Sequence, residues 1–274
     1  MEMPHQVKRR NREVVIRVKD VHLSFDGRPV LCGVDLTVYR GETLVVLGAS
    51  GSGKSTLLRV IVGALEPTSG SVELLGRDVY SLEDEPLRAL QRRFGILFQS
   101  GALYSSMTVG ENIAVVIREH WDLDEEIVRI MVKLKLELVG LREFESLLPS
   151  QLSGGMRKRV GLARALALDP EIIFYDEPTA GLDPIVEGVI DKLVMDLSRG
   201  LGITSVVVTH EMPSAFKVAD RLVLLNEGRI VAEGSPEEFR TTVDPLVHQF
   251  VNGLPDGPIP LRRSRDDRED DLLF

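Results

Sequence analysis

Short continuous apolar runs recur along this chain and are separated by segments with a helical pattern. Runs of this kind are typical of parallel strands that are covered on both faces. The strands predicted in this way are Thr43–Leu47, Phe94–Gln99, Glu171–Pro178 and Ser205–His210. A helical run follows the first of them at Thr56–Leu65. The pattern therefore predicts an α/β protein with a mainly parallel sheet.

The ends of the chain and one central stretch follow different patterns. Strands are predicted near the start, at 14–18, 21–25 and 30–38, and a hairpin at 221–234 precedes a short helix that opens with Pro236. Residues 100–165 are predicted to form a helical insertion, with helices at Val109–His120 and Asp124–Gly140 and another helix after Gly155. From about Thr241 the prolines and mixed charges predict irregular structure.

Composition restricts the class of protein. The 274 residues are 43% hydrophobic and 27% charged, which is ordinary for a globular domain with additions. A net charge of −9 argues against nucleic acid as the main partner. No apolar run approaches the ~18 residues of a membrane span, and the single cysteine, Cys32, excludes an internal disulfide framework.

A glycine-rich segment between the first predicted buried strand and its helix matches the pattern G-x-x-x-x-G-K-[S/T]. Its backbone N–H groups and the following helix start can surround a phosphate group. Lys54 is placed to reach the β- and γ-phosphates, and the Ser55 hydroxyl to bind Mg²⁺. A glycine-rich turn with a solvated lysine is the alternative, and the flanking strand and helix argue against it. The segment consists of Gly48, Ala49, Ser50, Gly51, Ser52, Gly53, Lys54, Ser55 and Thr56.

Polar residues follow three of the predicted buried strands. Open α/β sheets bind ligands at the carboxyl ends of their strands, so these residues are expected at one edge. Asp176 is predicted to hold Mg²⁺ and Glu177 to polarise the attacking water. Gln99 could sense the metal or the water, and His210 could contact the γ-phosphate. The alternatives are a polar strand end for Gln99 and a structural histidine.

Two further positions are candidates for ligand contact. Ser153, Gly154 and Gly155 precede a predicted helix, where a serine cap and exposed N–H groups form a second anion site. A helix cap without a ligand is the alternative. Phe25 could stack on an adenine ring or could be an ordinary core aromatic, and the sequence leaves the two equally open.

Taken together, GASGSGKST, Gln99, LSGGM, IIFYDE, GLD and His210 resemble the ATP-binding-cassette (ABC) ATPases over roughly residues 14–240. This resemblance implies a RecA-like phosphate-loop domain, with an antiparallel β subdomain and a helical subdomain at about 100–165. It also implies that two copies sandwich two ATP molecules, with Ser153–Gly155 of one facing the ATP of the other. By position, the resemblance implies that Phe25 stacks on the adenine, that Asp176 is the acid on the magnesium side and that Glu177 is the catalytic base. It implies that Gln99 is a sensor residue, Asp183 a dimer contact and His210 a switch residue.

Finer features resemble the ATPase subunit of phospholipid transporters that maintain outer-membrane lipid asymmetry (the Mla type). They are Met156, which replaces the common Gln, and the segments Leu97–Ile113, Ile117–His120 and Asp176–Ile185. The resemblance implies a peripheral protein on the cytoplasmic face of the inner membrane. Its expected partners are a membrane permease, an MCE-type (mammalian-cell-entry) lipid-binding subunit and a small regulatory subunit.

The two ends of the chain lie outside the expected ATPase domain. Residues 1–13 form a polar basic tail, and residues 241–274 form an extension. The segment Gln249–Arg262 resembles the Mla-type extension that embraces the second ATPase copy, so the extension is expected to be a dimer clasp.

Three other functions fit parts of the sequence. An importer ATPase for a small polar solute, such as an amino acid, shares the ATP-binding motifs, but LSGGM and the C-terminal segment argue against it. A soluble factor in translation or chromosome maintenance would carry two cassettes or a very long coiled coil, and neither is present. A nonhydrolytic regulatory subunit is disfavoured by intact Lys54, Asp176, Glu177 and His210.

Overall fold

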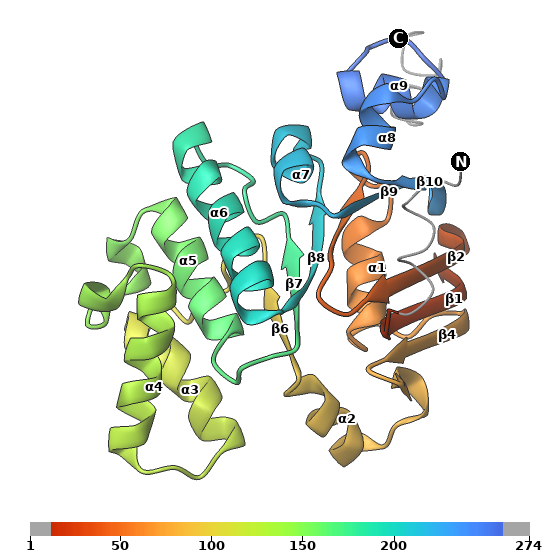
Figure 1. The fold of residues 1–274 in the computed structure, drawn as a ribbon. Helices are drawn as coiled ribbons and strands as arrows, with labels where there is room; N and C mark the ends of the chain where they lie inside the picture. Colours follow the sequence, from red (N-terminus) through yellow and green to blue (C-terminus); the bar gives the residue numbers. More distant parts are fainter. Residues whose placement is uncertain (1–11, 260–274) are drawn as a thin grey trace, which may run out of the picture.

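Two β-sheets lie side by side in the computed structural model, which describes residues 12–259 (Figure 1). The first sheet is antiparallel and has the order β2-β1-β4-β5. Its β1 unites the two short strands predicted at 14–18 and 21–25, with register shifts around Val21. The strands are β1 (Val14–Phe25), β2 (Arg28–Tyr39), β4 (Ser69–Leu74) and β5 (Arg77–Asp78).

The second sheet has the order β10-β9-β3-β8-β7-β6 and is parallel except for its edge strand β10. Every residue of β3 and β8 is buried, as expected for central strands covered on both faces. The α/β class and the predicted buried strands are confirmed. The strands are β3 (Thr43–Leu47), β6 (Phe94–Leu97), β7 (Ile172–Asp176), β8 (Thr204–Thr209), β9 (Arg221–Asn226) and β10 (Arg229–Gly234).

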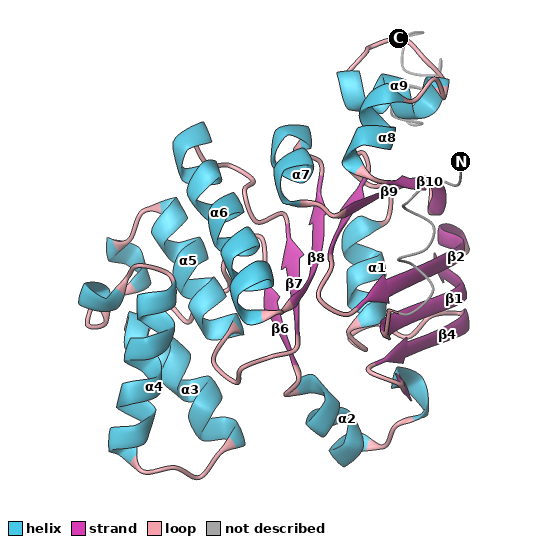
Figure 2. Cartoon of the chain, in the orientation of Figure 1, coloured by secondary structure: helices cyan, strands magenta, loops and turns pink. Residues whose placement is uncertain are grey.

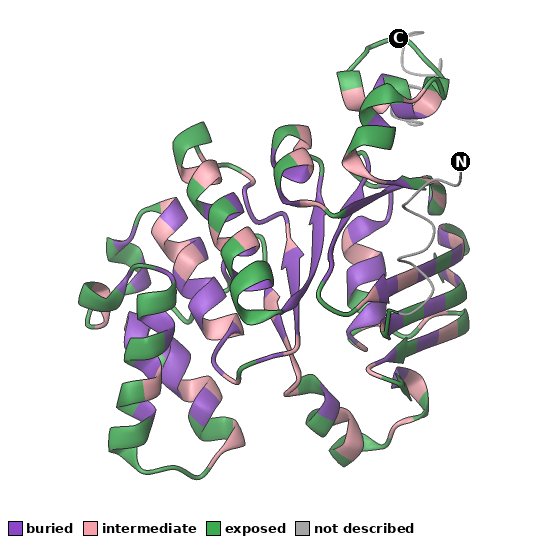
Figure 3. Ribbon diagram, in the orientation of Figure 1, coloured by how far each residue is buried: buried purple, intermediate pink, exposed green. Residues whose placement is uncertain are grey.

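Helices cover both faces of the parallel sheet (Figure 2). Alternate side chains of β7 belong to two separate hydrophobic clusters: Ile172 and Phe174 face α1 and the antiparallel sheet, whereas Ile173 and Tyr175 face α5 and α6. The central strands β3, β7, β8 and β9 and the helix faces that cover them are buried, as Figure 3 shows. The helices of these layers are α1 (Lys54–Ile61), α2 (Asp84–Gln91), α5 (Gly154–Ala165), α6 (Pro184–Leu201) and α7 (Met212–Val218).

The helical insertion forms a subdomain from α3 (Val109–His120), α4 (Glu125–Leu138) and α5. Thr108 and Glu111 form a capping box at the start of α3. The buried Asn112 side chain binds backbone groups of Tyr104, Met107 and Thr108, which fixes the loop before the helix. Three short 3₁₀ turns lie at Val79–Ser81, Arg142–Phe144 and Pro149–Gln151.

The C-terminal extension is more regular than its composition predicts. The hairpin and the short helix α8 (Pro236–Thr241) are followed by α9 (Pro245–Asn252), so the prediction of irregular structure from Thr241 is wrong for these residues. Asp244 caps α9, and Val247 is buried against the cluster that also contains Phe239. The burial of one apolar face offsets the helix-breaking composition around it.

The structure describes only part of each terminal segment. Residues 1–11 of the basic tail and residues 260–274 of the extension lie outside the described residues. Glu13, at the end of the predicted tail, forms an ion pair with Arg40 and is therefore attached to the domain. None of the helices within residues 12–259 has the length and apolar character of a membrane span.

Candidate functional site

The glycine-rich segment forms the loop between β3 and α1, and the backbone conformation of this loop requires glycine. Gly51 and Gly53 have φ values of +74° and +105°, in the left-handed region that favours glycine. A Cβ atom on Gly48 would lie 2.3 Å from the carbonyl oxygen of Leu225 in β9. The loop conformation therefore depends on glycine at these three positions.

The Lys54 side chain is buried within this loop. Its Nζ atom donates hydrogen bonds to the carbonyl oxygens of Gly48 at 2.7 Å and Ala49 at 3.1 Å. Burial lowers the pKa of Lys54, and the nearby carboxylates of Glu177 and Asp176 oppose that shift. The buried Ser52 hydroxyl has no hydrogen-bond partner in the described chain, so the loop retains a free polar group for a ligand.

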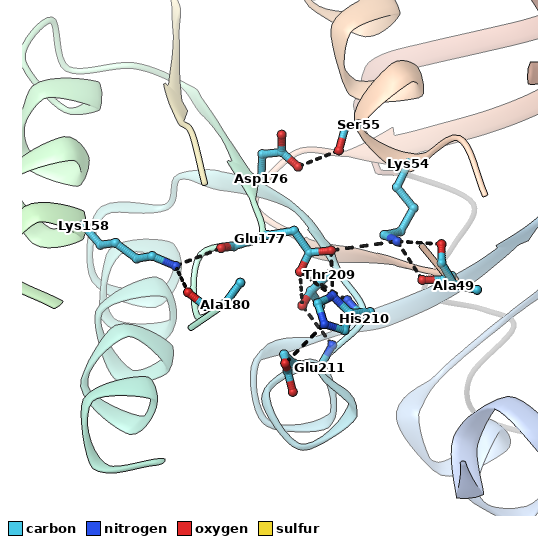
Figure 4. A network of polar contacts seen from close by, with 11 residues as sticks. Ala49, Lys54, Ser55, Lys158, Asp176, Glu177, Ala180, Thr209, His210 and Glu211 are labelled. Atoms are coloured by element: carbon cyan, nitrogen blue, oxygen red, sulfur yellow. Dashed lines mark hydrogen bonds and ion pairs between the residues drawn. The ribbon is translucent and has the colours of Figure 1, made fainter. Parts of the chain in front are cut away.

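Asp176 and Ser55 meet at the sheet edge. The Ser55 hydroxyl donates a hydrogen bond of 2.9 Å to Oδ1 of Asp176, although the two residues are 121 positions apart (Figure 4). One hydroxyl and one carboxylate are oxygen ligands suited to Mg²⁺, which usually keeps several waters and takes further oxygens from a phosphate group. The described residues contain no cluster of three or more acidic, His or Cys side chains that could hold a metal ion.

Glu177 lies directly after β7 with its carboxylate enclosed. Its side chain is 11% exposed. Thr209 donates a hydrogen bond of 3.1 Å to Oε2, and Nδ1 of His210 lies 2.9 Å from the same oxygen. Nζ of Lys54 is 3.8 Å from Oε1. The structure therefore brings Lys54, Glu177 and His210 together as the strand order predicts.

Two residues of this network were not found from the sequence. Thr209 is the polar residue before His210 at the end of β8, a signal that could have been noticed. Lys158 on α5 donates hydrogen bonds to the carbonyl oxygens of Glu177 at 3.1 Å and Ala180 at 2.7 Å (Figure 4). Its place in the basic run Arg157–Arg159 gives no sign that this lysine is buried.

Gln99 and Asp183 do not join this network within the chain. Gln99 lies two residues beyond the end of β6, is exposed, and makes no hydrogen bond with the described residues. Asp183 caps α6 by accepting hydrogen bonds of 3.1 Å from the N–H groups of Ile185 and Val186. The sensor and dimer-contact roles of these residues remain predictions.

The residues of the predicted second anion site, Ser153–Gly155, lie at the start of α5. Ser153 caps the helix by accepting a hydrogen bond of 3.2 Å from the Met156 N–H group. A Cβ atom on Gly155 would lie 2.3 Å from Val186, so glycine allows the helix start to approach α6. Within residues 12–259, no hydrogen bond or ion pair joins Ser153, Gly154 or Gly155 to the phosphate loop.

The position of Phe25 decides whether this residue is a core aromatic, which the sequence left open. It ends β1 of the antiparallel sheet and is 46% exposed, so it is not a core aromatic. An exposed ring at a strand end is available for stacking, and adenine stacking remains a prediction for this residue.

The chain is similar to known proteins over most of its length. Residues 31–180 match the model of the ABC transporter family. The intermembrane phospholipid transport system ATP-binding protein MlaF of Escherichia coli K12 is 41% identical over 259 residues, which cover 94% of this chain and 96% of that protein. A Mycobacterium leprae protein described as a probable ribonucleotide transport ATP-binding protein, mkl, is 41% identical over 254 residues, which cover 93% of this chain and 73% of that protein.

A solved structure is similar to the fold as well as to the sequence. It is a dimeric ATP-binding cassette in a post-hydrolysis state, bound to ADP and Pi. Its TM-score is 0.75 at 32% sequence identity, and the match covers 81% of this chain and 98% of that chain.

Replacing Phe25 separates a stacking role from a packing role. Because the ring is half exposed, Phe25→Ala should change the free energy of unfolding by less than about 1 kcal/mol. Loss of stacking, at about 1–3 kcal/mol, should weaken ATP binding about 5- to 150-fold. Phe25→Tyr, which keeps the ring, is the matched control and should bind like the parent. Fluorescent-nucleotide titration and urea unfolding measure the two quantities. Unchanged ATP affinity in Phe25→Ala would exclude stacking.

Proposed function

The chain belongs to the ABC transporter family, and from that premise we propose that it is the ATP-hydrolysing subunit of a transporter that moves phospholipid. Family membership makes it an ATP-binding ATPase. The observation that carries the chemical part of the proposal is the enclosed Glu177 carboxylate, held beside Lys54, Thr209 and His210 at the end of β7.

The phosphate loop binds ATP through its backbone and Lys54. When the nucleotide is bound, the Lys54 cation exchanges its hydrogen bonds to the Gly48 and Ala49 carbonyls for contacts with phosphate oxygens. The N–H groups at the start of α1 complete the anion site. The exposed ring of Phe25 stacks on the adenine from the antiparallel sheet.

Glu177 acts as the general base. It accepts a proton from a water molecule while that water's oxygen bonds to the γ-phosphorus and the bond to the β–γ bridging oxygen breaks. His210 and Thr209 hold the carboxylate in place from β8. Ser55 and Asp176 would hold Mg²⁺, which supplies neutralisation of the phosphate charge when bound. Gln99, in the exposed loop after β6, would supply a further oxygen ligand to Mg²⁺.

Two chains are needed to complete each site. The helix start at Ser153–Gly155, with its serine cap and N–H groups, would face the ATP of the partner copy in a head-to-tail dimer. The related cassette solved as a dimer with ADP and Pi supports the same arrangement. Asp183, which is exposed at the start of α6, would contact the partner copy.

The phospholipid assignment comes from the relatives. The E. coli relative named for intermembrane phospholipid transport aligns with nearly the whole of both chains. The transporter would comprise a membrane permease, an MCE-type lipid-binding subunit and a small regulatory subunit, with this chain at the cytoplasmic face of the inner membrane. Nucleic acid is not among the proposed partners, since the net charge is −9.

A polar-solute importer is the competing function. The M. leprae relative described as a probable ribonucleotide transporter subunit is equally identical but is longer, because the match covers 73% of it. The E. coli relative is covered over 96% of its length. This more complete match favours phospholipid over a polar solute such as a ribonucleotide or an amino acid.

Glu177→Gln tests the proposed hydrolysis. The amide keeps the shape and the hydrogen bond from Thr209 but cannot accept a proton, so turnover should fall by about 10²–10⁴-fold while ATP remains bound. Phosphate release and equilibrium ATP binding measure the two effects in parallel. Glu73→Gln, the same change at a half-exposed position of the antiparallel sheet, is the control and should hydrolyse ATP normally. A Glu177→Gln variant with near-parent turnover would refute the assignment of the base.

We also propose that the C-terminal extension clasps the second copy. Gln249 is buried, and its amide group binds the backbone of Leu254 and Ile259, so α9 holds the following loop near the phosphate loop. That loop, α9 and the phosphate-loop residues Ala49 and Ser50 line a largely apolar pocket. Residues 253–259 therefore lie beside the phosphate loop, where the proposed second copy would bind.

Truncation after Gly253 tests the clasp without removing α9. Loss of residues 254–274 should weaken ATP-dependent dimerisation at least about tenfold, or about 1.4 kcal/mol, and leave ATP affinity of the single chain unchanged. Sedimentation at several protein concentrations with ATP, in the Glu177→Gln background, measures the dimer. A chain ending at Ile259 is the comparison that keeps the contacts of Gln249. Equal dimerisation of the full and the truncated chains would contradict the clasp.

A further inference from the structure

A buried lysine of α5 connects that helix to the chain segment that carries Glu177. Lys158 is 6% exposed and lies one helical turn after the helix start at Gly154. Its Nζ atom donates to two carbonyl oxygens, those of Glu177 at 3.1 Å and Ala180 at 2.7 Å. Burial lowers the pKa of Lys158 to about 8, and the carboxylates of Glu177 and Glu187 oppose the shift. A buried ammonium group is costly, so these two bonds account for its placement.

The turn to which Lys158 donates its hydrogen bonds has an unfavourable backbone conformation. Glu177 has a φ value of +49°, which a residue with a side chain rarely adopts. Such a conformation costs on the order of 1–3 kcal/mol and persists only where its surroundings hold it. The Glu177 N–H group donates to Val208 in β8, and its carbonyl oxygen accepts bonds from Ala180 and Lys158. Lys158 is the side chain that fixes this backbone from the helix layer.

The backbone and the carboxylate of Glu177 are held from different directions. Thr209, His210 and Lys54 contact the carboxylate from the β8 side and the phosphate loop. Lys158 contacts only the backbone, from α5, as Figure 4 shows. The direction in which the carboxylate points is set by that backbone, because a rotation of φ at Glu177 would swing the whole side chain.

The geometry points to Lys158 as a positioning residue that holds the Glu177–Ala180 turn and thereby aims the carboxylate of Glu177 at the attacking water. This inference rests on the proposed hydrolysis and deepens it. Lys158 makes no hydrogen bond with the phosphate loop, Ser55 or Asp176, so it acts on the reaction and leaves ATP binding intact. Because α5 begins at the second anion site, Lys158 also connects that site to Glu177 through a single turn of helix.

Lys158→Met removes the charge and the donors while keeping the length of the side chain. A displaced general base loses much of its effect, so kcat should fall at least about tenfold, while KM for ATP should change by less than about threefold. Lys135→Met is the matched control, because Lys135 is equally buried and pairs with Asp169 but does not contact Glu177. After correction for the folded fraction by urea unfolding, its kcat should lie within about twofold of the parent. If the Met variant does not fold, Lys158→Leu, which likewise lacks N–H donors, is assayed by the same criteria.

A double-mutant cycle separates positioning from general stability. If Lys158 acts through Glu177, Lys158→Met should change the residual single-turnover rate of Glu177→Gln by less than about twofold, because the base is already absent. A further tenfold loss in that background would contradict positioning, as would an unchanged kcat in Lys158→Met alone. A parent chain that releases no phosphate would instead contradict the proposed function, so the two failures are distinguishable.

Discussion

The parallel order of β3, β8 and β7 is the constraint on which the site depends. Because β8 lies between the other two strands and all three run the same way, their carboxyl ends meet at one edge of the sheet. The phosphate loop leaves β3, Glu177 follows β7 and His210 follows β8 at that edge. The complete burial of β3 and β8 makes this register rigid, since a one-residue slip would expose apolar side chains or bury polar ones.

The helices on the two faces of the sheet supply the side chains that surround Glu177 at this edge. The α1 side supplies the phosphate loop and Lys54, whereas α5 supplies Lys158 and the helix start at Ser153–Gly155. Glu177 lies between these two layers and contacts both: its carboxylate lies near Lys54, and its backbone carbonyl accepts a hydrogen bond from Lys158. Events at the start of α5 can therefore reach the reaction centre without passing through the phosphate loop.

Much of this arrangement could be predicted from the sequence, because continuous apolar runs and the glycine-rich motif depend on local chemistry. The strands of the parallel sheet and the helix at Val109–His120 are predicted almost to the residue. Helix α9 was missed because Pro245 and the prolines after it suggest irregular structure, whereas burial of Val247 stabilises the helix. Lys158 was missed because its partners are backbone carbonyls that lie 19 and 22 positions away, which no residue pattern shows.

The central claim is that ATP hydrolysis in this chain powers phospholipid movement, and native complexes test it most directly. The full-length chain is purified by affinity from native membranes, and the proteins and lipids that accompany it are identified by mass spectrometry. The account predicts a permease, an MCE-type lipid-binding subunit and enriched phospholipid. A permease for a polar solute, without enriched lipid, would contradict the substrate assignment while leaving the ATPase chemistry intact.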